Sequence, residues 1–219
     1  MNDIDYYKLL GIKSPYTRFK NKFDLKQVMR GWNGNNPFLS NIVKEKRPNS
    51  IIEVGSFLGL STITMAKACK ECNLNTKILC VDTWLGSPEH WRSDQCNLLN
   101  LYDYFENGIS AMYDQFIINM IVNKIDDMVI PIPNTSKNAF NILQLKNVKV
   151  DMVYIDGSHD TDDVYNDIIL YFKLLNKNGY MFGDDYGGWE SVRKGVHLAL
   201  EKINGKLEIH DNLFWSIKL

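Results

Sequence analysis

The chain has 219 residues, of which 45% are hydrophobic and 23% are charged, so it can bury a hydrophobic core of its own. Its formal net charge of −1 leaves no basic surplus for nucleic acid or for an anionic membrane surface. The acidic N-terminus lacks the basic flank and apolar run of a secretory signal, and no window is long and apolar enough to span a membrane. We therefore expect a cytoplasmic protein with one α/β domain, whose oligomeric state the sequence leaves open, a homo-oligomer included.

Residues 1–48 are predicted to form a helical preface to the main domain, which spans residues 49–219. Turn-forming residues gather between Gly31 and Pro37, and Pro37 begins a short helix that ends near Lys46. The sequence leaves open whether this preface only precedes the sheet or also covers the mouth of an active site.

A strand, a glycine turn and a helix follow one another from residue 50. The apolar strand Ser50–Val54 runs directly into a turn that begins at Gly55. This order is typical of a nucleotide-binding start, but a pyrophosphate site requires glycine where this chain has Phe57 and Leu60. The turn is therefore predicted to hold a ligand without phosphates, with a tight turn that binds nothing as the alternative.

The second strand, Lys77–Val81, ends in an acid. Asp82 lies roughly 20 residues beyond Gly59, where a carboxylate is placed to accept hydrogen bonds from ribose hydroxyls. This spacing favours a ligand that contains adenosine.

The segment 83–127 is too long for a simple crossover and is rich in aromatic residues. Long insertions beyond strand ends are often lids. We therefore predict that the Trp84–Trp91 loop closes over the site and that the remainder forms one or two helices. Packing of these aromatic side chains, without any functional contact, is the competing interpretation.

The third strand, Met128–Ile132, contains proline, which suits an edge strand or a strand end. Thr135 and Ser136 begin the next helix, which runs to Leu145. The strand is therefore predicted either to lie at an edge of the sheet or to carry its prolines at a strand end.

A βαβ unit comes next and organises the chain. The apolar strand Asp151–Ile155 is followed by a helix whose apolar face includes Val164, Ile168 and Leu175. The strand Tyr180–Gly183 completes the unit. Two parallel strands joined by one helix end at the same edge of a sheet.

Both strands of this unit end in carboxylates, so Asp156, Asp184 and Asp185 are expected to converge. Such a cluster repels itself unless a cation neutralises it, and oxygen ligands suit a hard cation such as Mg²⁺. His159 lies three residues beyond the first acid and is expected to overlook the same point. The alternative is that Asp156 caps the following helix and that the Asp184–Asp185 pair makes a turn.

The chain is predicted to end with a helix from Trp189 to Ile203 and a hairpin of two strands, Lys206–His210 and Leu213–Ile217. So short a turn joins only antiparallel strands. The predicted fold is a Rossmann-like, doubly wound α/β sheet of seven strands, five parallel ones and the terminal hairpin.

Three sequence features together resemble a class I S-adenosylmethionine-dependent methyltransferase over about residues 50–219: the turn IEVGSFLGLS, the VD that ends the second strand, and the acids after the fourth and fifth strands. The spacing of the three aspartates is similar to that of metal-dependent O-methyltransferases of the catechol type. The sequence segments IDGSHDTDDVYNDI and GYMFGDDY are most similar to those of sugar and macrolide O-methyltransferases and of the cephalosporin-hydroxylase-like group.

This resemblance implies a set of site residues. The expected contacts of the cofactor S-adenosylmethionine are Glu53, Gly55, Phe57, Gly59, Ser61, Asp82, Ser136 and Asp156. Mg²⁺ or another divalent cation is expected at Asp156, Asp184 and Asp185. The stretch after the third strand lacks the acid that many methyltransferases use near the adenine, and Ser136 is expected to substitute for it.

His159 falls where the catechol-type enzymes carry a catalytic lysine, so the resemblance implies that it is the general base. A role as a further metal ligand and a purely structural role are the alternatives. The expected activity is metal-dependent methyl transfer to a hydroxyl of a small acceptor, such as a sugar, glycan or polyol, with neither nucleic acid nor a membrane as partner. The competing functions are a metal-independent methyltransferase, another Rossmann-like enzyme such as an oxidoreductase, and a cofactor-binding module without turnover.

Overall fold

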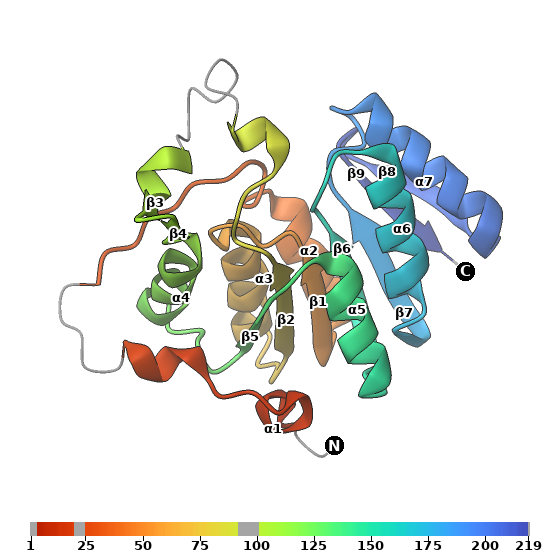
Figure 1. Cartoon of the computed structure of the whole chain (residues 1–219). Coiled ribbons are helices and arrows are strands. Elements are labelled where there is room, and N and C mark those ends of the chain that lie inside the picture. Colours follow the sequence, from red (N-terminus) through yellow and green to blue (C-terminus); the bar gives the residue numbers. More distant parts are fainter. Residues whose placement is uncertain (1–3, 20–24, 92–100, 219) are drawn as a thin grey trace.

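The computed structural model describes residues 4–19, 25–91 and 101–218, and within them a seven-stranded sheet forms the centre of the fold (Figure 1). The order of its strands is β5-β2-β1-β6-β7-β9-β8. The strands are β1 (Ser50–Val54), β2 (Lys77–Asp82), β5 (Val129–Pro133), β6 (Val150–Ile155), β7 (Leu175–Gly183), β8 (Lys206–His210) and β9 (Phe214–Lys218). A separate small ribbon consists of β3 (Phe105–Glu106) and β4 (Ile109–Ser110).

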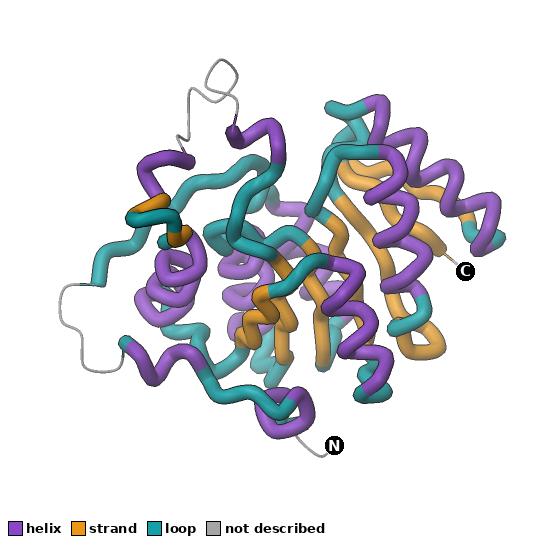
Figure 2. The backbone as a smooth tube through the Cα atoms, viewed as in Figure 1, coloured by secondary structure: helices purple, strands orange, loops and turns teal. Residues whose placement is uncertain are grey.

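Helices cover both faces of the sheet (Figure 2). They are α1 (Tyr6–Leu10), α2 (Pro37–Lys46), α3 (Leu60–Glu71), α4 (Met112–Val122), α5 (Ser136–Leu145), α6 (Thr161–Phe172) and α7 (Glu190–Ile203), with 3₁₀ turns η1 (Pro15–Arg18), η2 (Pro88–Trp91) and η3 (Leu101–Tyr104). Buried residues of α2, α3 and α4 pack on one face, and those of α5, α6 and α7 pack on the other. Successive residues of β1 face these two cores in turn, with Ile51 in one and Ile52 in the other, so the strand is buried on both faces.

The predicted fold class is confirmed. Strands β5, β2, β1, β6 and β7 are parallel, and β9 pairs antiparallel with both β7 and β8. One boundary prediction is wrong, because α6 ends at Phe172 and Leu175 belongs to β7 rather than to the helix. The backbone N–H of Val150 donates to the Leu174 carbonyl at 2.9 Å, so the chain already pairs with β6 at that point.

Strand β5 is an edge strand, one of the two placements that its prolines allow, since in the described sheet it pairs only with β2. Two tyrosine hydroxyls from the N-terminal segment, Tyr7 and Tyr16, donate to the Val129 carbonyl at 3.2 and 3.0 Å. These contacts attach the N-terminal segment to the end of the sheet that lies opposite the carboxyl ends of the strands.

From this edge the N-terminal segment passes α4 and reaches the carboxyl edge of the sheet (Figure 1). Asn119 of α4 holds it, because the Asn119 side chain accepts from the Val28 N–H at 3.0 Å and donates to the Val28 carbonyl at 2.8 Å. The same amide donates to the Leu58 carbonyl in the glycine turn at 2.8 Å. The N-terminal segment is therefore tied to the turn after β1. Among the described helices, none has the length and apolar character that a membrane crossing requires.

Candidate active site

A cavity of about 990 Å³ opens at the carboxyl edge of the sheet, where open α/β sheets bind ligands. Its described walls come from the N-terminal segment, the turn after β1, the loop after β2, the start of α5, the loop between β6 and α6 with the first turns of α6, and the loop after β7. The lining residues fall within 30–34, 54–61, 81–90, 134–137, 156–170 and 184–189. Part of the predicted insertion, residues 92–100, lies outside the described residues.

The glycine turn is shaped by a close approach of two loops. Gly55 has a φ of +89°, and a Cβ at this position would lie 1.8 Å from the Asp156 carbonyl oxygen. Only glycine fits there without moving the loop after β6. The turn places Phe57 and Ser61 on the cavity wall together with Gly55.

Glu53 and Gly59, two predicted cofactor contacts, do not line the cavity. Glu53 is fully buried beneath the turn, where its carboxylate accepts hydrogen bonds from the Ser56 hydroxyl at 2.9 Å, the Ser61 hydroxyl at 2.6 Å and the Thr62 hydroxyl. Because both carboxylate oxygens are used in this way, Glu53 shapes the turn from below. Gly59 begins α3 and lies against α4.

Asp82 connects the turn after β1 to the loop after β2. One carboxylate oxygen accepts from the Phe57 N–H at 2.8 Å and the other from the Trp84 N–H at 2.7 Å. Burial raises the pKa of Asp82, and these two amides oppose that shift. A carboxylate has about four lone-pair sites, so Asp82 retains capacity for a further donor from the cavity.

The closure of the Trp84–Trp91 loop over a ligand stays a prediction: Gly86, Ser87, Pro88 and His90 of this loop line the cavity, but its two tryptophans do not. Trp84 is only 1% exposed, packs on Tyr113 and Phe116, and donates from Nε1 to the Phe57 carbonyl at 2.7 Å. Trp91 does not line the cavity and donates to the Leu85 carbonyl. The tryptophans that do line the cavity are Trp32 and Trp189.

The three predicted acids converge as expected. The buried Tyr154 hydroxyl lies 3.0 Å from Asp156 Oδ2 and 3.5 Å from Asp184 Oδ2, so it connects these carboxyl groups. Burial raises the pKa of Asp156 well above its usual value, and the charges of Asp184 and Asp185 raise it further. Burial and the Asp185 charge raise the pKa of Asp184 to about 7. Asp156 does not cap α6, whose N-cap is Asp160.

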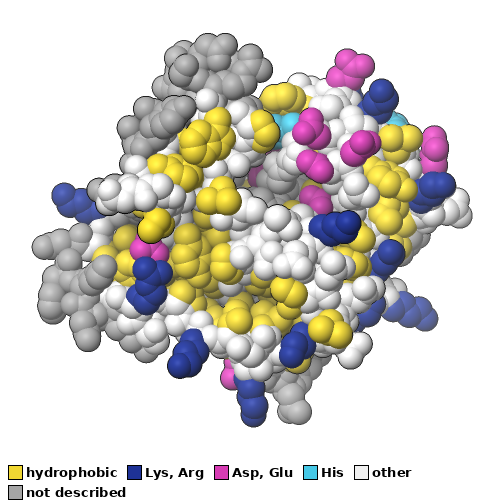
Figure 3. Space-filling view, viewed as in Figure 1, with side chains coloured by type: hydrophobic (Ala, Val, Ile, Leu, Met, Phe, Trp, Pro, Cys, Tyr) yellow, Lys and Arg dark blue, Asp and Glu magenta, His cyan; other side chains and the backbone are white. Residues whose placement is uncertain are grey.

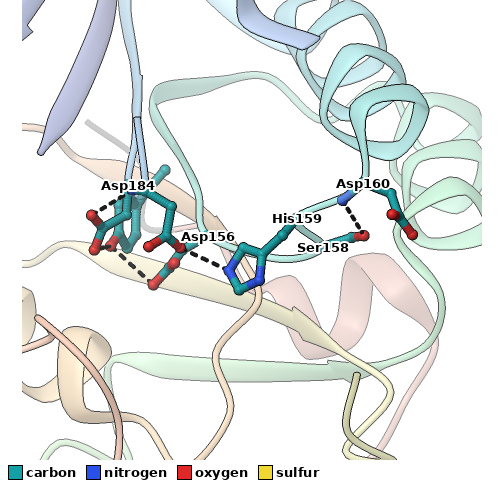
Figure 4. Close-up of polar contacts among 7 residues, drawn as sticks. Asp156, Ser158, His159, Asp160 and Asp184 are labelled. Carbon is teal, nitrogen blue, oxygen red and sulfur yellow. Dashed lines mark hydrogen bonds and ion pairs between the residues drawn. The ribbon is translucent and has the colours of Figure 1, made fainter. Parts of the chain in front are cut away.

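His159 lies beside this cluster (Figure 4). Its Nε2 is 2.8 Å from Asp185 Oδ2, and its ring stacks on Trp189 with the centroids 4.2 Å apart. The carboxylate and the indole together fix the orientation of the imidazole. His159, Asp185 and Trp189 all line the cavity.

The acid cluster fits a hard cation in its donor chemistry, because carboxylate oxygens are the ligands that such ions prefer. Within residues 4–19, 25–91 and 101–218, however, no three His, Cys, Asp or Glu side chains are grouped as a metal site. Asp185 is engaged with His159, and Tyr154 links the other two acids. The metal site therefore stays a prediction.

Ser136 lines the cavity as predicted, and beside it lies an acid that the sequence analysis missed. The Ser136 hydroxyl donates to Asp167 Oδ1, and the Tyr171 hydroxyl donates to the Ser136 carbonyl at 2.9 Å. Burial raises the pKa of Asp167 to about 7. Asp167 of α6 thus places a carboxyl group beside the start of α5, on the cavity wall. Nothing in the sequence indicated that Asp167 lines a cavity, because acids also occur on helical faces that are exposed to solvent.

The cavity has a strongly acidic lining, and Figure 3 shows acidic side chains gathered around the hollow on that face. Among the described residues, seven aspartates line it, against two side chains with a permanent positive charge, Arg30 and Lys137. These aspartates are Asp82, Asp156, Asp160, Asp163, Asp167, Asp184 and Asp185. In their ionised form these carboxyl groups attract cationic ligands and repel phosphates and carboxylates, although burial raises the pKa of Asp156, Asp167 and Asp184.

A parallel sheet with helices on both faces, a glycine turn after its first strand and acids at its carboxyl edge define a Rossmann-like nucleoside-binding enzyme. A family model described as "Methyltransferase domain" matches residues 52–186, more than half of the chain. The protein therefore belongs to this methyltransferase family, which confirms the predicted class over the oxidoreductase alternative.

Individual relatives are distant. An uncharacterized protein of Acanthamoeba polyphaga mimivirus is 38% identical over 61 residues, which are 28% of this chain and 23% of the viral protein. An O-methyltransferase from Bacillus cereus, solved with S-adenosylhomocysteine, matches with a TM-score of 0.58 at 13% identity over 100% of this chain and 92% of its own. The O-methyltransferase TomG from Streptomyces achromogenes, solved with S-adenosylmethionine, matches with a TM-score of 0.57 at 12% identity over 100% and 91%. At these identities the structural matches establish a shared fold.

Proposed function

We propose that the protein transfers a methyl group from S-adenosylmethionine to a hydroxyl of a small acceptor, such as a sugar or polyol, with the help of a divalent cation. One observation carries this proposal: a single cavity of about 990 Å³ contains both the glycine turn with Asp82 and the acid cluster with His159. Drug-sized ligands occupy cavities of about 300–1,000 Å³, so the volume suits a cofactor with a small second substrate.

The acidic lining supports this choice of cofactor. S-adenosylmethionine carries a sulfonium cation and no phosphate, and the cavity has seven aspartates against two permanently positive side chains in the described chain. The glycine turn also supports a cofactor without phosphates, because Phe57 occupies a position where a pyrophosphate-binding turn requires glycine. Two proteins of the same fold were solved with this cofactor or its demethylated product.

The chemistry requires a base, because a hydroxyl group is a poor nucleophile until its proton is removed. When bound, S-adenosylmethionine supplies an electrophilic methyl group. With His159 Nε2 bonded to Asp185 at 2.8 Å, Nδ1 is the ring nitrogen that accepts the hydroxyl proton, and Asp185 stabilises the imidazolium that forms. Trp189 keeps the imidazole plane fixed by stacking. The cavity walls hold the acceptor near the donor, which removes much of the entropic barrier.

Asp156, Asp184 and Asp185 are the residues that would hold a divalent cation. When bound, such an ion lowers the pKa of a coordinated hydroxyl and orients it. A second candidate is metal-independent methyl transfer, which the hydrogen bond between His159 and Asp185 favours, because Asp185 then serves the base rather than an ion.

One experiment tests the proposal and separates these candidates. Calorimetry measures binding of S-adenosylmethionine, and transfer of a labelled methyl group is then followed across a panel of sugars, polyols and phenols with Mg²⁺ or with EDTA. Metal-dependent transfer predicts turnover that EDTA abolishes while cofactor binding persists. Full turnover in EDTA would reject the metal-dependent reaction in favour of the metal-independent one. Absence of S-adenosylmethionine binding by the wild type would refute both reactions.

A further inference from the structure

Three aromatic side chains meet on one wall of the cavity, and none of them lies in the acid cluster. Trp32 stacks on His90 with ring centroids 5.3 Å apart and an interplanar angle of 13°. Phe57 lies 5.9 Å from Trp32 and 5.4 Å from His90, measured between centroids. All three line the cavity, yet Trp32 is 46% exposed. So much uncovered indole inside a cavity is a surface on which an apolar ligand face can pack.

The backbone that carries Trp32 is firmly placed. A Cβ at Gly34 would lie 2.7 Å from the Ser61 N–H nitrogen, so the segment rests directly on the start of α3. Asn119 ties the same segment to the glycine turn through Val28 and Leu58. The aromatic wall is therefore a fixed part of the cavity.

This wall adjoins the acid cluster. Asn33 follows Trp32 in the chain, and its side-chain hydrogen bond to Asp184 lowers the pKa of that carboxyl group. The wall and the acid cluster are therefore parts of one cavity. The family match spans residues 52–186, so Phe57 and His90 lie inside it and Trp32 lies outside it.

We propose that Trp32 and His90, beside Phe57 of the cofactor-binding turn, form the acceptor subsite and that it takes an uncharged sugar ring, whose apolar C–H face packs on the indole. This inference rests on the proposed function, because it names the acceptor of that same reaction. An uncharged polyol suits the neighbouring acids, since carboxylates accept hydrogen bonds from hydroxyl groups. The same acids repel a phosphorylated or carboxylated acceptor.

The test measures binding of three probes to the protein loaded with S-adenosylhomocysteine, by saturation-transfer NMR titration. The probes are methyl glucoside, glucose 6-phosphate and catechol. We expect methyl glucoside to bind the wild type, glucose 6-phosphate to bind at least about tenfold more weakly, and Trp32→Ala to weaken methyl glucoside binding by about tenfold. Trp32→Phe should retain most of the binding, because it keeps an aromatic face.

Trp91→Ala is the matched control, since Trp91 is a 40% exposed tryptophan that does not line the cavity, and this variant should bind methyl glucoside like the wild type.

Equal affinity of the wild type and Trp32→Ala for methyl glucoside overturns the subsite. Tighter binding of catechol, equal binding of glucose 6-phosphate, or no binding of methyl glucoside overturns the sugar assignment. Calorimetry with S-adenosylmethionine distinguishes these outcomes from failure of the proposed function, because a protein that binds the cofactor but no sugar refutes only the inference. Thermal unfolding of each variant verifies that its fold is intact.

Discussion

His159 is held from two sides, by the Asp185 carboxylate and by the Trp189 ring. If it is the base, His159→Ala should lower kcat by about 10²–10⁴ while the affinity for S-adenosylmethionine stays near that of the wild type. Asp185→Asn should lower kcat as well, because an amide cannot stabilise the imidazolium as a carboxylate does. Steady-state kinetics with calorimetry measures both effects.

His197→Ala is the control for this pair, because His197 on α7 bonds the Tyr186 hydroxyl and does not line the cavity. It should leave kcat unchanged. A loss of thermal stability with near-normal kcat in His159→Ala would assign His159 a structural role. Activity restored to that variant by high Mg²⁺ would make it a metal ligand.

Asp167 provides a prediction for the dependence of stability on pH. Burial raises its pKa to about 7 in the folded protein, whereas the unfolded chain ionises near the ordinary value of about 3.9. Between these values the folded state binds more protons, so the free energy of unfolding falls as pH rises from about 4 to 7. The largest change attributable to this one group is about 4 kcal/mol.

Asp167→Asn should flatten that dependence, because asparagine cannot ionise but still accepts from Ser136. Urea unfolding at intervals from pH 4 to pH 8 measures the slope. Asp184 shifts in the same direction, so the wild type and the variant are compared directly, and identical slopes would show that Asp167 titrates normally.

At the scale of the elements, α4 positions the N-terminal wall of the cavity through one buried side chain. Asn119 is fully buried and binds Val28 and Leu58 with three hydrogen bonds. Asn119→Ala leaves those backbone groups unpaired and should lower the free energy of unfolding by about 1–3 kcal/mol. It should also speed hydrogen exchange of the amides in residues 25–36 and raise KM for the acceptor.

Asn123→Ala on the same helix is the control for Asn119→Ala. The Asn123 amide bonds only the Asn119 carbonyl within α4, so its loss should leave exchange in residues 25–36 unchanged. Equal exchange rates in the wild type and Asn119→Ala would mean that other contacts hold the N-terminal segment.

At the scale of the whole molecule, ligand binding should be visible as stability. S-adenosylhomocysteine at a hundred times its Kd should stabilise the fold by about 2.7 kcal/mol, which corresponds to a rise in Tm of roughly 5–10 °C for a chain of this length. ATP should produce no comparable rise, because the acidic cavity repels its phosphates. A calorimetric scan with each ligand measures these shifts in Tm. Equal stabilisation by ATP would contradict the conclusion that the acidic cavity repels phosphates.

The sequence alone was sufficient to predict the fold class and the convergence of the acids at the strand ends. Parallel strands joined by helices end at one edge, so Asp82, Asp156 and the Asp184–Asp185 pair had to meet once the strands were recognised. The prolines of β5 limited that strand to an edge or a strand end, and the structure has it at an edge. These features depend on local pattern and on connectivity, and both can be read along the chain.

Which side chains face the cavity was decided only by the tertiary structure. Trp84 and Trp32 look alike in sequence, yet Trp84 is covered by Tyr113 and Phe116 whereas Trp32 lies on the cavity wall. Asp167 has a raised pKa because tertiary packing buries it, and the hydrogen bond from Ser136 at the start of α5 opposes that rise. Exposure, burial and pKa depend on contacts between residues far apart in the chain, and no local pattern contains those contacts.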